Sequence, residues 1–390
     1  MNRKLKITLI TILTIIATII AVVGGYFVYL VTAYHRIDDN LALEITSKGQ
    51  VKDFVSTDTE YSILSYNIGY GALISDYSFF MDGGKESKAR DEKDLIANVA
   101  GIAKQINDAN VDFVMIQEVD VDATRTFGFN EVEDLENKLE FGNYVYAQNY
   151  DSPFLFYPVL DPIGASESGI LTGSKYKITE SLRRQLPIAS GFSKFFDLDR
   201  CFSVSRIPVN NNKQLVIYNL HLSAYGSNPT IREQQLNTLF EEMKKDLEKD
   251  NYVICGGDFN HNLRAKWDET KAPDWAQPFP HDVLPEKTAF GFNVSNYTNI
   301  DADSCRNNDT GYVKGTTFTV LLDGIIVSDN VKVDFYQVLE LEFERSDHNP
   351  VLMKFKLMNL EPEKKAAVKD EKKNEVKKPD NKKNEKKRSK

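Results

Sequence analysis

Short apolar runs alternate with amphipathic segments from about residue 58 to residue 358. Several of these runs are hydrophobic at consecutive positions, which is typical of strands that are covered on both faces. The pattern therefore predicts strands in the core of a folded domain. We expect them at Tyr61–Tyr66, Asp112–Gln117, Gln214–Leu222, Tyr252–Cys255, Thr319–Val327 and Pro350–Leu357.

Between the strands, hydrophobic residues recur at the three- and four-residue spacing of helices. One such set runs from Leu95 to Ile106. A second helix is expected after Thr230, because Thr230 and Glu233 have the spacing of a capping box. A third is expected to begin at Asn130. No internal repeat is visible, so the mixture predicts one α/β domain with helices outside a sheet core.

An uncharged, mostly apolar stretch covers Ile7 to Tyr34. It exceeds the ~20 residues that a membrane-spanning helix needs. A cleaved signal peptide is the alternative, but its apolar core is roughly 7–15 residues, and no clear cleavage site lies near the end of this stretch. Three basic residues precede the stretch and Asp38 and Asp39 follow it, so the positive-inside rule predicts a cytoplasmic N-terminus and an extracellular body. We expect one transmembrane anchor at 1–34 and a linker at 35–57.

The C-terminal segment 359–390 is rich in Lys, Glu, Asn and Pro and has almost no apolar residues, so we expect it to be a disordered tail. It carries 13 basic and 7 acidic residues, which leaves the rest of the chain at −15 within an overall charge of −9. So acidic a body argues against tight non-specific binding to a nucleic-acid backbone, which depends on Lys and Arg. The tail is either simply solvated or in contact with anionic polymers or lipid headgroups of the envelope.

The composition of the remaining chain fits a folded domain at 58–358. Hydrophobic residues make up 42% and charged residues 27% of the sequence, which is ordinary for a globular protein. Cys201, Cys255 and Cys305 have no metal-ligand spacing, and their odd number does not indicate a disulfide framework. We expect a monomer.

Polar groups gather where the predicted strands end. In layered α/β proteins the loops at strand ends converge on one rim, so these groups can meet although they are far apart in sequence. Taken singly, each is as well explained by a turn, a helix cap or a buried core histidine. Together they form an oxygen-rich set suited to Mg²⁺, with Mn²⁺ or Ca²⁺ as alternatives, and to acid–base handling of a water molecule and a leaving group. The set comprises Asn67, Glu118, His221, Asp258, Asn260, Asp323, Asp347 and His348.

Six short motifs carry these residues in a fixed order along the chain. They are SYNIG (65–69), IQEV (116–119), NLHLS (219–223), GGDFN (256–260), LLDGIIVS (321–328) and SDHNPV (346–351). In this order they resemble the endonuclease/exonuclease/phosphatase superfamily, which includes deoxyribonucleases, abasic-site endonucleases, neutral sphingomyelinases and inositol polyphosphate 5-phosphatases. The resemblance implies a four-layer α/β sandwich, with two mixed sheets packed face to face and helices outside, and Mg²⁺ dependence.

The resemblance also implies a metal site. Glu118 matches the superfamily's principal metal-binding glutamate. Asn67 lies beside it in the pattern, and Asp347 is a further possible ligand.

Catalytic roles follow from the same match. Asp258 matches the aspartate that orients or deprotonates the attacking water, and Asn260 the amide that holds the phosphate or that aspartate. His348 matches the histidine at the scissile phosphate, with Asp323 as the carboxylate that orients it. His221 matches the histidine that stabilises charge on phosphorus or protonates the leaving oxygen. The implied reaction is in-line displacement by water, with no covalent intermediate.

Some positions bear on the choice of substrate. Gly69 stands where abasic-site enzymes carry an aspartate, which counts against DNA repair. Arg125, Arg200 and Arg306 are candidates for contact with the substrate phosphate, because an Arg fork suits phosphate oxygens, but each is equally explained by an ion pair. His261 is a further candidate for the cleft.

Aromatic residues gather in the segment 262–312, between two of the motifs. The segment is either a lid, a membrane-contacting loop or a long loop packed on its own aromatic rings, and the last is favoured. The residues are Trp267, Trp275, Phe279, Phe290, Phe292 and Tyr297, and a second cluster with the same ambiguity comprises Phe192, Phe195 and Phe196.

The sequence thus predicts a membrane-anchored hydrolase of phosphodiesters or phosphomonoesters. Nucleic acid, phospholipid and small sugar or inositol phosphates all remain open as substrates, because one site on this fold serves many of them. A catalytically silent binding or scaffolding protein is the rival hypothesis. The presence of all eight expected groups argues against it.

Overall fold

The computed structural model describes residues 2–191, 194, 199–224, 229–264, 273, 275–296 and 298–359. Several positions named above lie outside the described residues. They are Phe192, Phe195, Phe196, Trp267, Tyr297 and the tail beyond residue 359.

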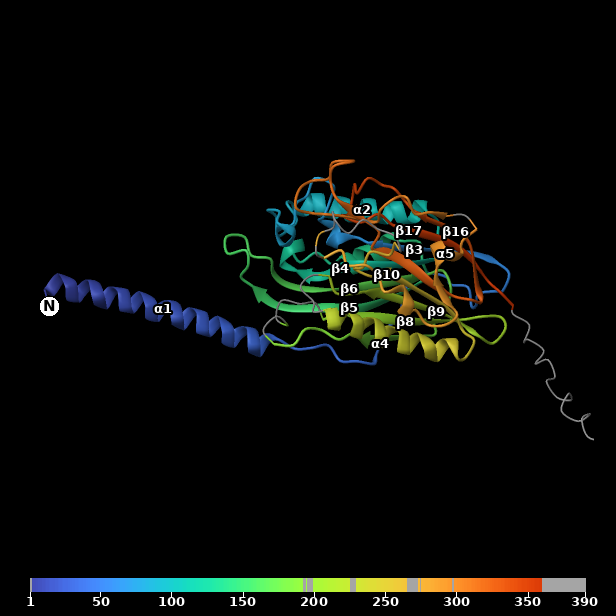
Figure 1. Cartoon of the computed structure of the whole chain (residues 1–390), viewed down its shortest axis with the longest axis horizontal. Helices are drawn as coiled ribbons and strands as arrows, with labels where there is room; N and C mark the ends of the chain where they lie inside the picture. The colour runs from blue at the N-terminus through green and yellow to red at the C-terminus, as the bar shows by residue number, and fades with distance from the viewer. Residues whose placement is uncertain are drawn as a thin grey trace, which may run out of the picture. The chain divides into compact units, whose positions relative to one another are not determined.

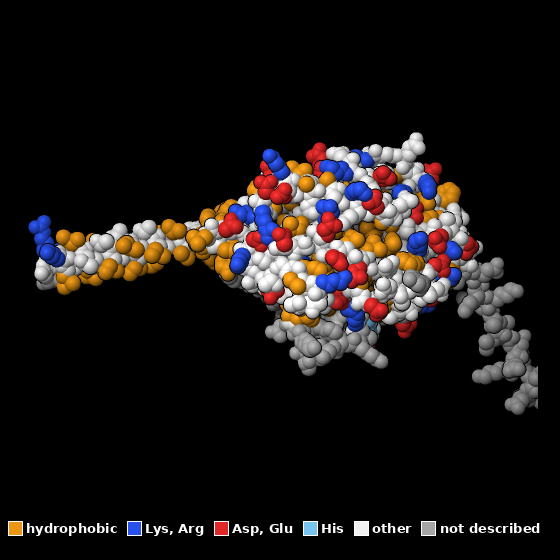
Figure 2. Space-filling model, turned by 90° about the horizontal axis from the view of Figure 1, so that it is seen from above, with side chains coloured by type: hydrophobic (Ala, Val, Ile, Leu, Met, Phe, Trp, Pro, Cys, Tyr) orange, Lys and Arg blue, Asp and Glu red, His pale blue; other side chains and the backbone are white. Residues whose placement is uncertain are grey.

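The N-terminal apolar stretch forms one helix, α1 (Arg3–Ala33). The Asn2 side chain caps it by accepting a hydrogen bond from the Lys4 amide. None of the most apolar part of α1 is buried against the rest of the described chain, and α1 has the length and composition of a membrane-spanning helix. Figure 2 shows hydrophobic side chains along α1 and basic side chains at its N-terminal end.

The larger of two main sheets has eight strands. Its order from edge to edge is β12 (Thr298–Asn299), β16 (Val331–Val338), β17 (Val351–Leu357), β3 (Glu60–Asn67), β4 (Phe113–Ala123), β6 (Gly164–Ser174), β5 (Asn143–Leu155) and β2 (Thr46–Ser47). The sheet is mixed, because β3 and β4 pair in parallel while β4 and β6 are antiparallel. Three of the predicted strands are found here as β3, β4 and β17.

The second sheet has seven strands. Its order is β1 (Leu41–Ala42), β7 (Glu180–Gln185), β8 (Cys201–Pro208), β9 (Gln214–His221), β10 (Tyr252–Asp258), β15 (Asp323–Ser328) and β11 (Thr288–Phe290). It is also mixed, since β10 is parallel to β9 and antiparallel to β15. The predicted strands at 214–222 and 252–255 are found as β9 and β10.

The prediction of one strand over Thr319–Val327 was wrong. The segment contains two strands, β14 (Thr319–Val320), which pairs with β13 (Cys305–Arg306), and β15 in the seven-stranded sheet. At the break, the carbonyls of Leu321 and Leu322 accept hydrogen bonds from loop amides, so this backbone leaves one ladder before it enters the next. The break leaves Asp323 as the first residue of β15.

The predicted helices are present, with one boundary shifted. The main helices are α2 (Glu92–Asp108), α3 (Glu131–Lys138) and α4 (Pro229–Leu247), with a short α5 (Gly291–Val294). Asn130 caps α3, as its position predicted. The capping box at Thr230 was wrong, because α4 already begins at Pro229 and Thr230 lies in its first turn. Proline favours the first helical position, where its missing N–H is not needed.

The two large sheets pack face to face, with helices on the outer sides. Along β4, Phe113 and Met115 belong to the core between the sheets, whereas Val114 and Ile116 belong to the core under α2. This alternation is the two-residue period of a strand covered on both faces. Figure 1 shows α2 on one side of the stacked sheets and α4 on the other. The four-layer α/β sandwich is thereby confirmed.

A buried polar link joins the two sheets below one end of the sandwich. Gln117 Nε2 on β4 donates to Asn219 Oδ1 on β9 over 2.8 Å, and Asn219 Nδ2 donates to the Leu171 carbonyl on β6 over 3.1 Å. Gln117 immediately precedes Glu118, and Asn219 lies two residues before His221 at the end of β9. The link therefore fixes the separation of β4 and β9 next to the positions of Glu118 and His221.

Candidate active site

Strand register brings three of the expected groups together. Asp258 at the end of β10 pairs with His221 on the parallel strand β9 and with Asp323 on the antiparallel strand β15. Gly257 permits this close pairing, since its φ is 144° and a Cβ there would meet the Leu220 carbonyl oxygen at 2.0 Å. The glycine of the GGDFN motif is thus required by the approach of β9.

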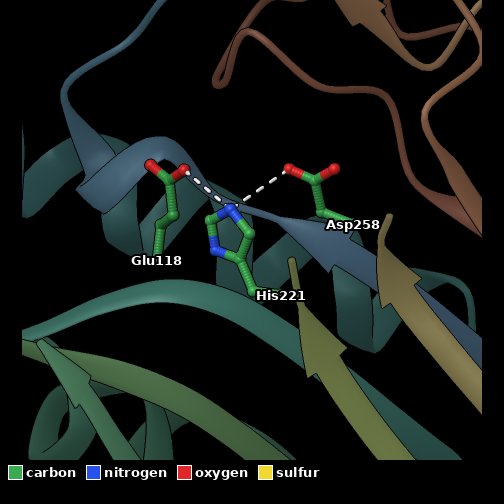
Figure 3. A group of neighbouring side chains, drawn as sticks. All are labelled: Glu118, His221 and Asp258. Carbon is green, nitrogen blue, oxygen red and sulfur yellow. Dashed lines mark ion pairs between the residues drawn. The ribbon is translucent and has the colours of Figure 1, made fainter. Parts of the chain in front are cut away.

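A backbone irregularity turns Glu118 into the same site. The β4–β6 ladder shifts register between Ile116 and Val119, and Glu118 has a φ of 57°, in the left-handed region. Such bulges re-aim a side chain at the end of a strand. The Glu118 carboxylate lies 3.8 Å from His221 Nε2, and the Asp258 carboxylate lies 3.4 Å from the same atom on the other side (Figure 3).

Asn67, at the end of β3, ties the carboxylates together. Its Nδ2 donates to Glu118 Oε1 and to Asp258 Oδ2, each over 3.1 Å. Its Oδ1 accepts a hydrogen bond from the Gly69 amide. The amide nitrogen rather than the oxygen faces the carboxylates, so in this arrangement Asn67 orients them, whereas the sequence suggested a metal ligand.

His348 is held by Asp323. Its Nδ1 lies 2.7 Å from Asp323 Oδ2, and both side chains are buried. Its Nε2 points to the centre of the site, 3.9 Å from Asp258 Oδ2. Burial opposes charge on this ring, but the Asp323 carboxylate and its neighbours outweigh burial and raise the pKa of His348 well above the usual value. The charged form of His348 is therefore favoured, with Nε2 as the ring nitrogen that faces the site.

Burial also displaces the pKa values of Asp258, Glu118 and His221, in each case toward the uncharged form. Burial, followed by the Asp323 carboxylate, raises the pKa of Asp258 to about 7. Burial and the Asp347 carboxylate raise the pKa of Glu118. Burial, with the nearby Arg200 cation, lowers the pKa of His221 well below its usual value. Several carboxylates thus face one another where their negative charge is poorly compensated.

The donor set fits a divalent cation. Among the described residues, two groups of three donors have ligand atoms within 4.8 Å of one another. One comprises Glu118, His221 and Asp258, and the other Asp258, Asp323 and His348. The carboxylate oxygens of these groups suit Mg²⁺ or Mn²⁺, and a cation would relieve the repulsion that raises the carboxylate pKa values.

A cavity of about 360 Å³ opens over these groups. Asp347 and Asn260 line it together with Glu118, His221, Asp258 and His348. The backbone amide of Asn260 donates to Asp258 Oδ1 over 2.8 Å, while its side chain donates to the Leu222 carbonyl. It is therefore the main chain of Asn260 that holds Asp258. The structure brings all eight predicted residues to one end of the sandwich.

A model of the endonuclease/exonuclease/phosphatase family matches residues 64–348. The chain belongs to this family. Its members are divalent-metal-dependent hydrolases of phosphoesters, which agrees with the oxygen-rich site, and the resemblance seen in the motifs is confirmed. A comparison with curated proteins gave no match.

Solved structures support the same fold. A family protein from Beutenbergia cavernae has a TM-score of 0.54 at 16% identity, covering 77% of this chain and 72% of its own. One from Bacteroides thetaiotaomicron has a TM-score of 0.51 at 17% identity, covering 78% and 99%. A third, from Leptotrichia buccalis, has a TM-score of 0.51 at 15% identity, covering 76% and 99%. At these identities the likeness concerns the fold alone.

One departure from the abasic-site branch of the family has a steric reason. Gly69 has a φ of 53°, and a Cβ on it would lie 2.9 Å from Asp347 Oδ1 and from a Leu73 side-chain carbon. An aspartate at this position would also place a second carboxylate against Asp347. The site as built therefore requires the glycine.

Arg125 lies in the cavity wall but is paired. Its Nε and Nη2 donate to the two oxygens of Asp120 over 3.0 and 2.8 Å, and its guanidinium lies 3.7 Å from the centre of the Tyr70 ring. This fixed, buried cation lies in the lining of the cavity near Glu118. Arg200 is also buried in the cavity wall.

Two other candidates have structural roles. Arg306 lines the cavity and donates to the carbonyls of Asn307, Thr310, Ile74 and Tyr77, so its guanidinium holds two loops together, and its contact with phosphate stays a prediction. His261 is buried, its Nδ1 lies 2.6 Å from the Phe259 carbonyl, and it is not among the residues that line the cavity. The expectation that His261 faces the cleft was wrong.

Sequence reasoning missed Asn308 and Tyr70. Asn308 Nδ2 donates to Asp347 Oδ2 over 2.5 Å, and both residues line the cavity. Tyr70 is buried in the cavity wall, and its hydroxyl has no hydrogen-bond partner within the described part of the chain. Neither residue ends an apolar run. Only the neighbouring Arg306 drew attention to the stretch that contains Asn308.

The aromatic segment between the motifs packs largely on itself. Phe279 and Phe290 are buried with ring centres 5.0 Å apart, and Phe292 stacks on Phe290 at 5.1 Å. Trp275 is partly buried and reaches the cavity wall. For the described members, the packing alternative is the observed one, and Trp275 alone touches the site.

Proposed function

We propose that this protein is a divalent-metal-dependent phosphodiesterase that cleaves its substrate by in-line attack of water. The observation that carries the proposal is the surrounding of Asp258. Asn67 donates to this carboxylate, His221 and His348 approach it at 3.4 and 3.9 Å, and the Asn260 amide fixes its second oxygen. Such a carboxylate is positioned to orient a water molecule and accept its proton.

The charge states of these residues suit proton transfer. The pKa of Asp258, about 7 before a cation binds, makes this group a suitable base near neutral pH. The imidazolium of His348 donates from Nε2 to a phosphate oxygen, since Asp323 occupies its Nδ1. His221 is neutral, and its Nε2 faces the space between Glu118 and Asp258, where a leaving oxygen or an equatorial oxygen would lie.

Glu118 and Asp347 are the carboxylates that would hold the cation, and Asn308 fixes the second of them. A bound divalent cation would neutralise charge that develops on the phosphate oxygens. Arg200 and Arg125 would add fixed positive charge in the same wall.

The shape of the cavity favours a diester over a monoester. Beyond the catalytic groups its wall is mixed, with polar residues such as Asp82 and Asn149 and an apolar part that comprises Leu73, Phe79, Met81, Ile163 and Leu322. A phosphodiester carries an organic substituent on each side of phosphorus, so one substituent has a surface to contact while the other leaves. A phosphomonoester has only its leaving group to place against this surface.

We further propose that α1 anchors the protein in the cell membrane with the catalytic domain outside. Arg3, Lys4 and Lys6 lie at the N-terminal end of α1, and the flank after it is mixed to acidic. The catalytic domain would then encounter envelope lipids, extracellular nucleic acid or nutrients.

The test is hydrolysis by the full chain in detergent, with bis-p-nitrophenyl phosphate and p-nitrophenyl phosphate compared at equal metal. The expected result is Mg²⁺- or Mn²⁺-dependent cleavage of the diester, abolished by EDTA and by Asp258→Asn. Glu140→Gln, a change at an exposed glutamate, is the control. Preference for the monoester would make the protein a phosphatase. No cleavage of either, despite metal binding, would favour the silent scaffold.

A further inference from the structure

An exposed apolar loop joins β5 to β6 beside α1. Its side chains point away from the core, with exposed fractions of 58% for Phe156, 64% for Tyr157, 77% for Val159 and 98% for Leu160. A soluble surface rarely presents so many large apolar groups in one short loop. We therefore expect another apolar surface to cover this loop.

The loop is fastened to the last turns of α1. Tyr26 Oη donates to the Phe154 carbonyl and accepts from the Phe156 amide, and Tyr29 Oη accepts from the Phe154 amide at 2.9 Å. The rings of Tyr26 and Phe156 also meet edge to face at 5.4 Å. These contacts hold the loop level with Tyr26 along the helix.

The length of α1 places that level at a membrane surface. The apolar stretch from Ile7 to Tyr34 has 28 residues, whereas about 20 residues cross the ~30 Å hydrocarbon core. Counted from Ile7, the core ends near Tyr26. Tyr26 and Tyr29 then occupy the interfacial position that tyrosines favour, and the loop fastened to them lies at the same depth.

The same loop borders the phosphoester cavity. The Ile163 amide donates to the Tyr157 carbonyl across the base of the loop, and the Ile163 side chain lines the cavity. On the other side, the ring of Phe80 lies 5.6 Å from that of Tyr157, while its neighbours Phe79 and Met81 line the cavity. The apolar cavity wall therefore continues onto the exposed loop.

We propose that loop 156–160 inserts into the lipid–water interface beside α1 and holds the cavity against the membrane, so that the substrate is a phosphoester of a membrane lipid. The second half rests on the phosphodiesterase function proposed above. The lipid headgroup would bring its phosphate to the catalytic groups, while its apolar part stays along Ile163, Phe79 and the loop. Continuity with α1 favours lipid over a protein partner.

The insertion is tested with the full chain in phospholipid nanodiscs. Leu160→Cys carries an environment-sensitive fluorophore, and labelling is selective because Cys201, Cys255 and Cys305 are buried. Phe54→Cys is the matched control, because Phe54 is also exposed, at 51%. Its neighbour Val55 pairs with Val209, next to the Pro208 end of β8. Arg36, just after α1, instead contacts Leu186 in the loop that leads to the opposite, Cys201 end of β8, so Phe54 lies at the end of β8 away from α1. Quenching by spin-labelled lipid at 160 and not at 54 is expected. Equal quenching of both labels by aqueous iodide alone would overturn the insertion.

The substrate class is tested separately. Val159→Ser with Leu160→Ser should lower hydrolysis of a phospholipid headgroup ester in the nanodisc about tenfold, a modest change in binding free energy, and leave cleavage of soluble bis-p-nitrophenyl phosphate unchanged. Equal loss on both substrates would overturn the interfacial role. Cleavage of the soluble diester without cleavage of any lipid phosphoester would reject the lipid substrate and leave the phosphodiesterase standing. Absence of both activities would reject the phosphodiesterase, while lipid quenching would still decide the insertion.

Discussion

Asp323 Oδ2 lies 2.7 Å from Nδ1 of His348, and this pair determines which nitrogen of the ring faces the site. Because Asp323 accepts a hydrogen bond from Nδ1–H, Nε2 is the ring atom presented to the cavity. The strand register that places Asp323 opposite Asp258 therefore also sets the chemistry of a histidine 25 residues further along the chain.

If Asp323 acts only by holding His348, the two residues form one unit. His348→Ala should lower turnover by roughly 10²–10⁴-fold, the usual contribution of a positioned proton donor. Asp323→Asn should cost much of that, and the double variant should be little worse than His348→Ala alone. Turnover of the four proteins on one soluble diester gives the answer. Losses that multiply would show that the two residues act independently.

Removal of one carboxylate should weaken metal binding without destabilising the metal-free protein. Glu118→Gln deletes one negative charge where Glu118, Asp258 and Asp347 repel one another, so the metal-free protein should melt at an equal or higher temperature than the parent. The rise in melting temperature on addition of Mg²⁺ or Mn²⁺ should shrink, and turnover at limiting metal should fall by orders of magnitude. Glu140→Gln should behave like the parent. An undiminished metal-induced rise would remove Glu118 from the metal site.

Acid should destabilise the protein through His261. Burial, with the neighbouring Arg232 cation, lowers the pKa of His261 to about 4. The folded state thus binds fewer protons at this residue than the unfolded state between about pH 6.5 and about 4, so stability is full above that range and falls as the pH drops through it. The loss is at most roughly 1.4 kcal/mol per pH unit.

His261→Asn keeps a donor near the Phe259 carbonyl and removes this titration. Melting temperatures of parent and variant should therefore converge as the pH falls from 7 to 4.5. Curves that stay parallel over this range would contradict a buried, neutral His261.

The polar link between the sheets should matter more for stability than its size suggests. Asn219→Ala removes one partner each from Gln117 Nε2 and the Leu171 carbonyl in a buried region, leaving Gln117 Nε2 only the longer contact to Ser65 Oγ, and a lost partner costs about 1–3 kcal/mol. A drop of several degrees in melting temperature is expected. Asn137→Ala, at an exposed asparagine of α3, should leave the melting temperature nearly unchanged. Similar melting of both variants would show that the link is replaceable.

Much of the fold followed from the sequence because burial leaves a periodic trace. Continuous apolar runs marked β9 and β10, and the polar residues that end them marked the rim. The pattern did not reveal the register in which the strands pair. Nothing in the sequence says that Asp258 pairs with both His221 and Asp323, because strand pairing is decided by distant contacts.

The parts of the site that were missed or misread depend on backbone geometry. The bulge that turns Glu118 inward requires a positive φ, which no residue type at that position signals. Asn308 lies in a segment without periodicity, where asparagine usually indicates a turn. Arg306 was a candidate for a phosphate contact or an ion pair, because an arginine's partners cannot be read from the sequence, and in the structure it donates to four backbone carbonyls.

The final prediction concerns topology, since it decides which substrates the site can meet. Three basic residues precede the apolar part of α1 and no equivalent cluster follows it, so the catalytic domain should lie outside the cell. The Lys-rich tail should not reverse this, because charges beyond a large domain contribute little to orientation. A protease that cannot cross the membrane, added to cells whose outer envelope has been made permeable, should remove the domain while a cytoplasmic marker protein stays intact. Moving the basic residues, by Arg3→Ser, Lys4→Ser and Lys6→Ser with three lysines placed after Tyr34, should protect the domain in the same assay. A domain that is protected in the parent and degraded only after lysis would reverse the topology and return intracellular phosphoesters to the candidate substrates.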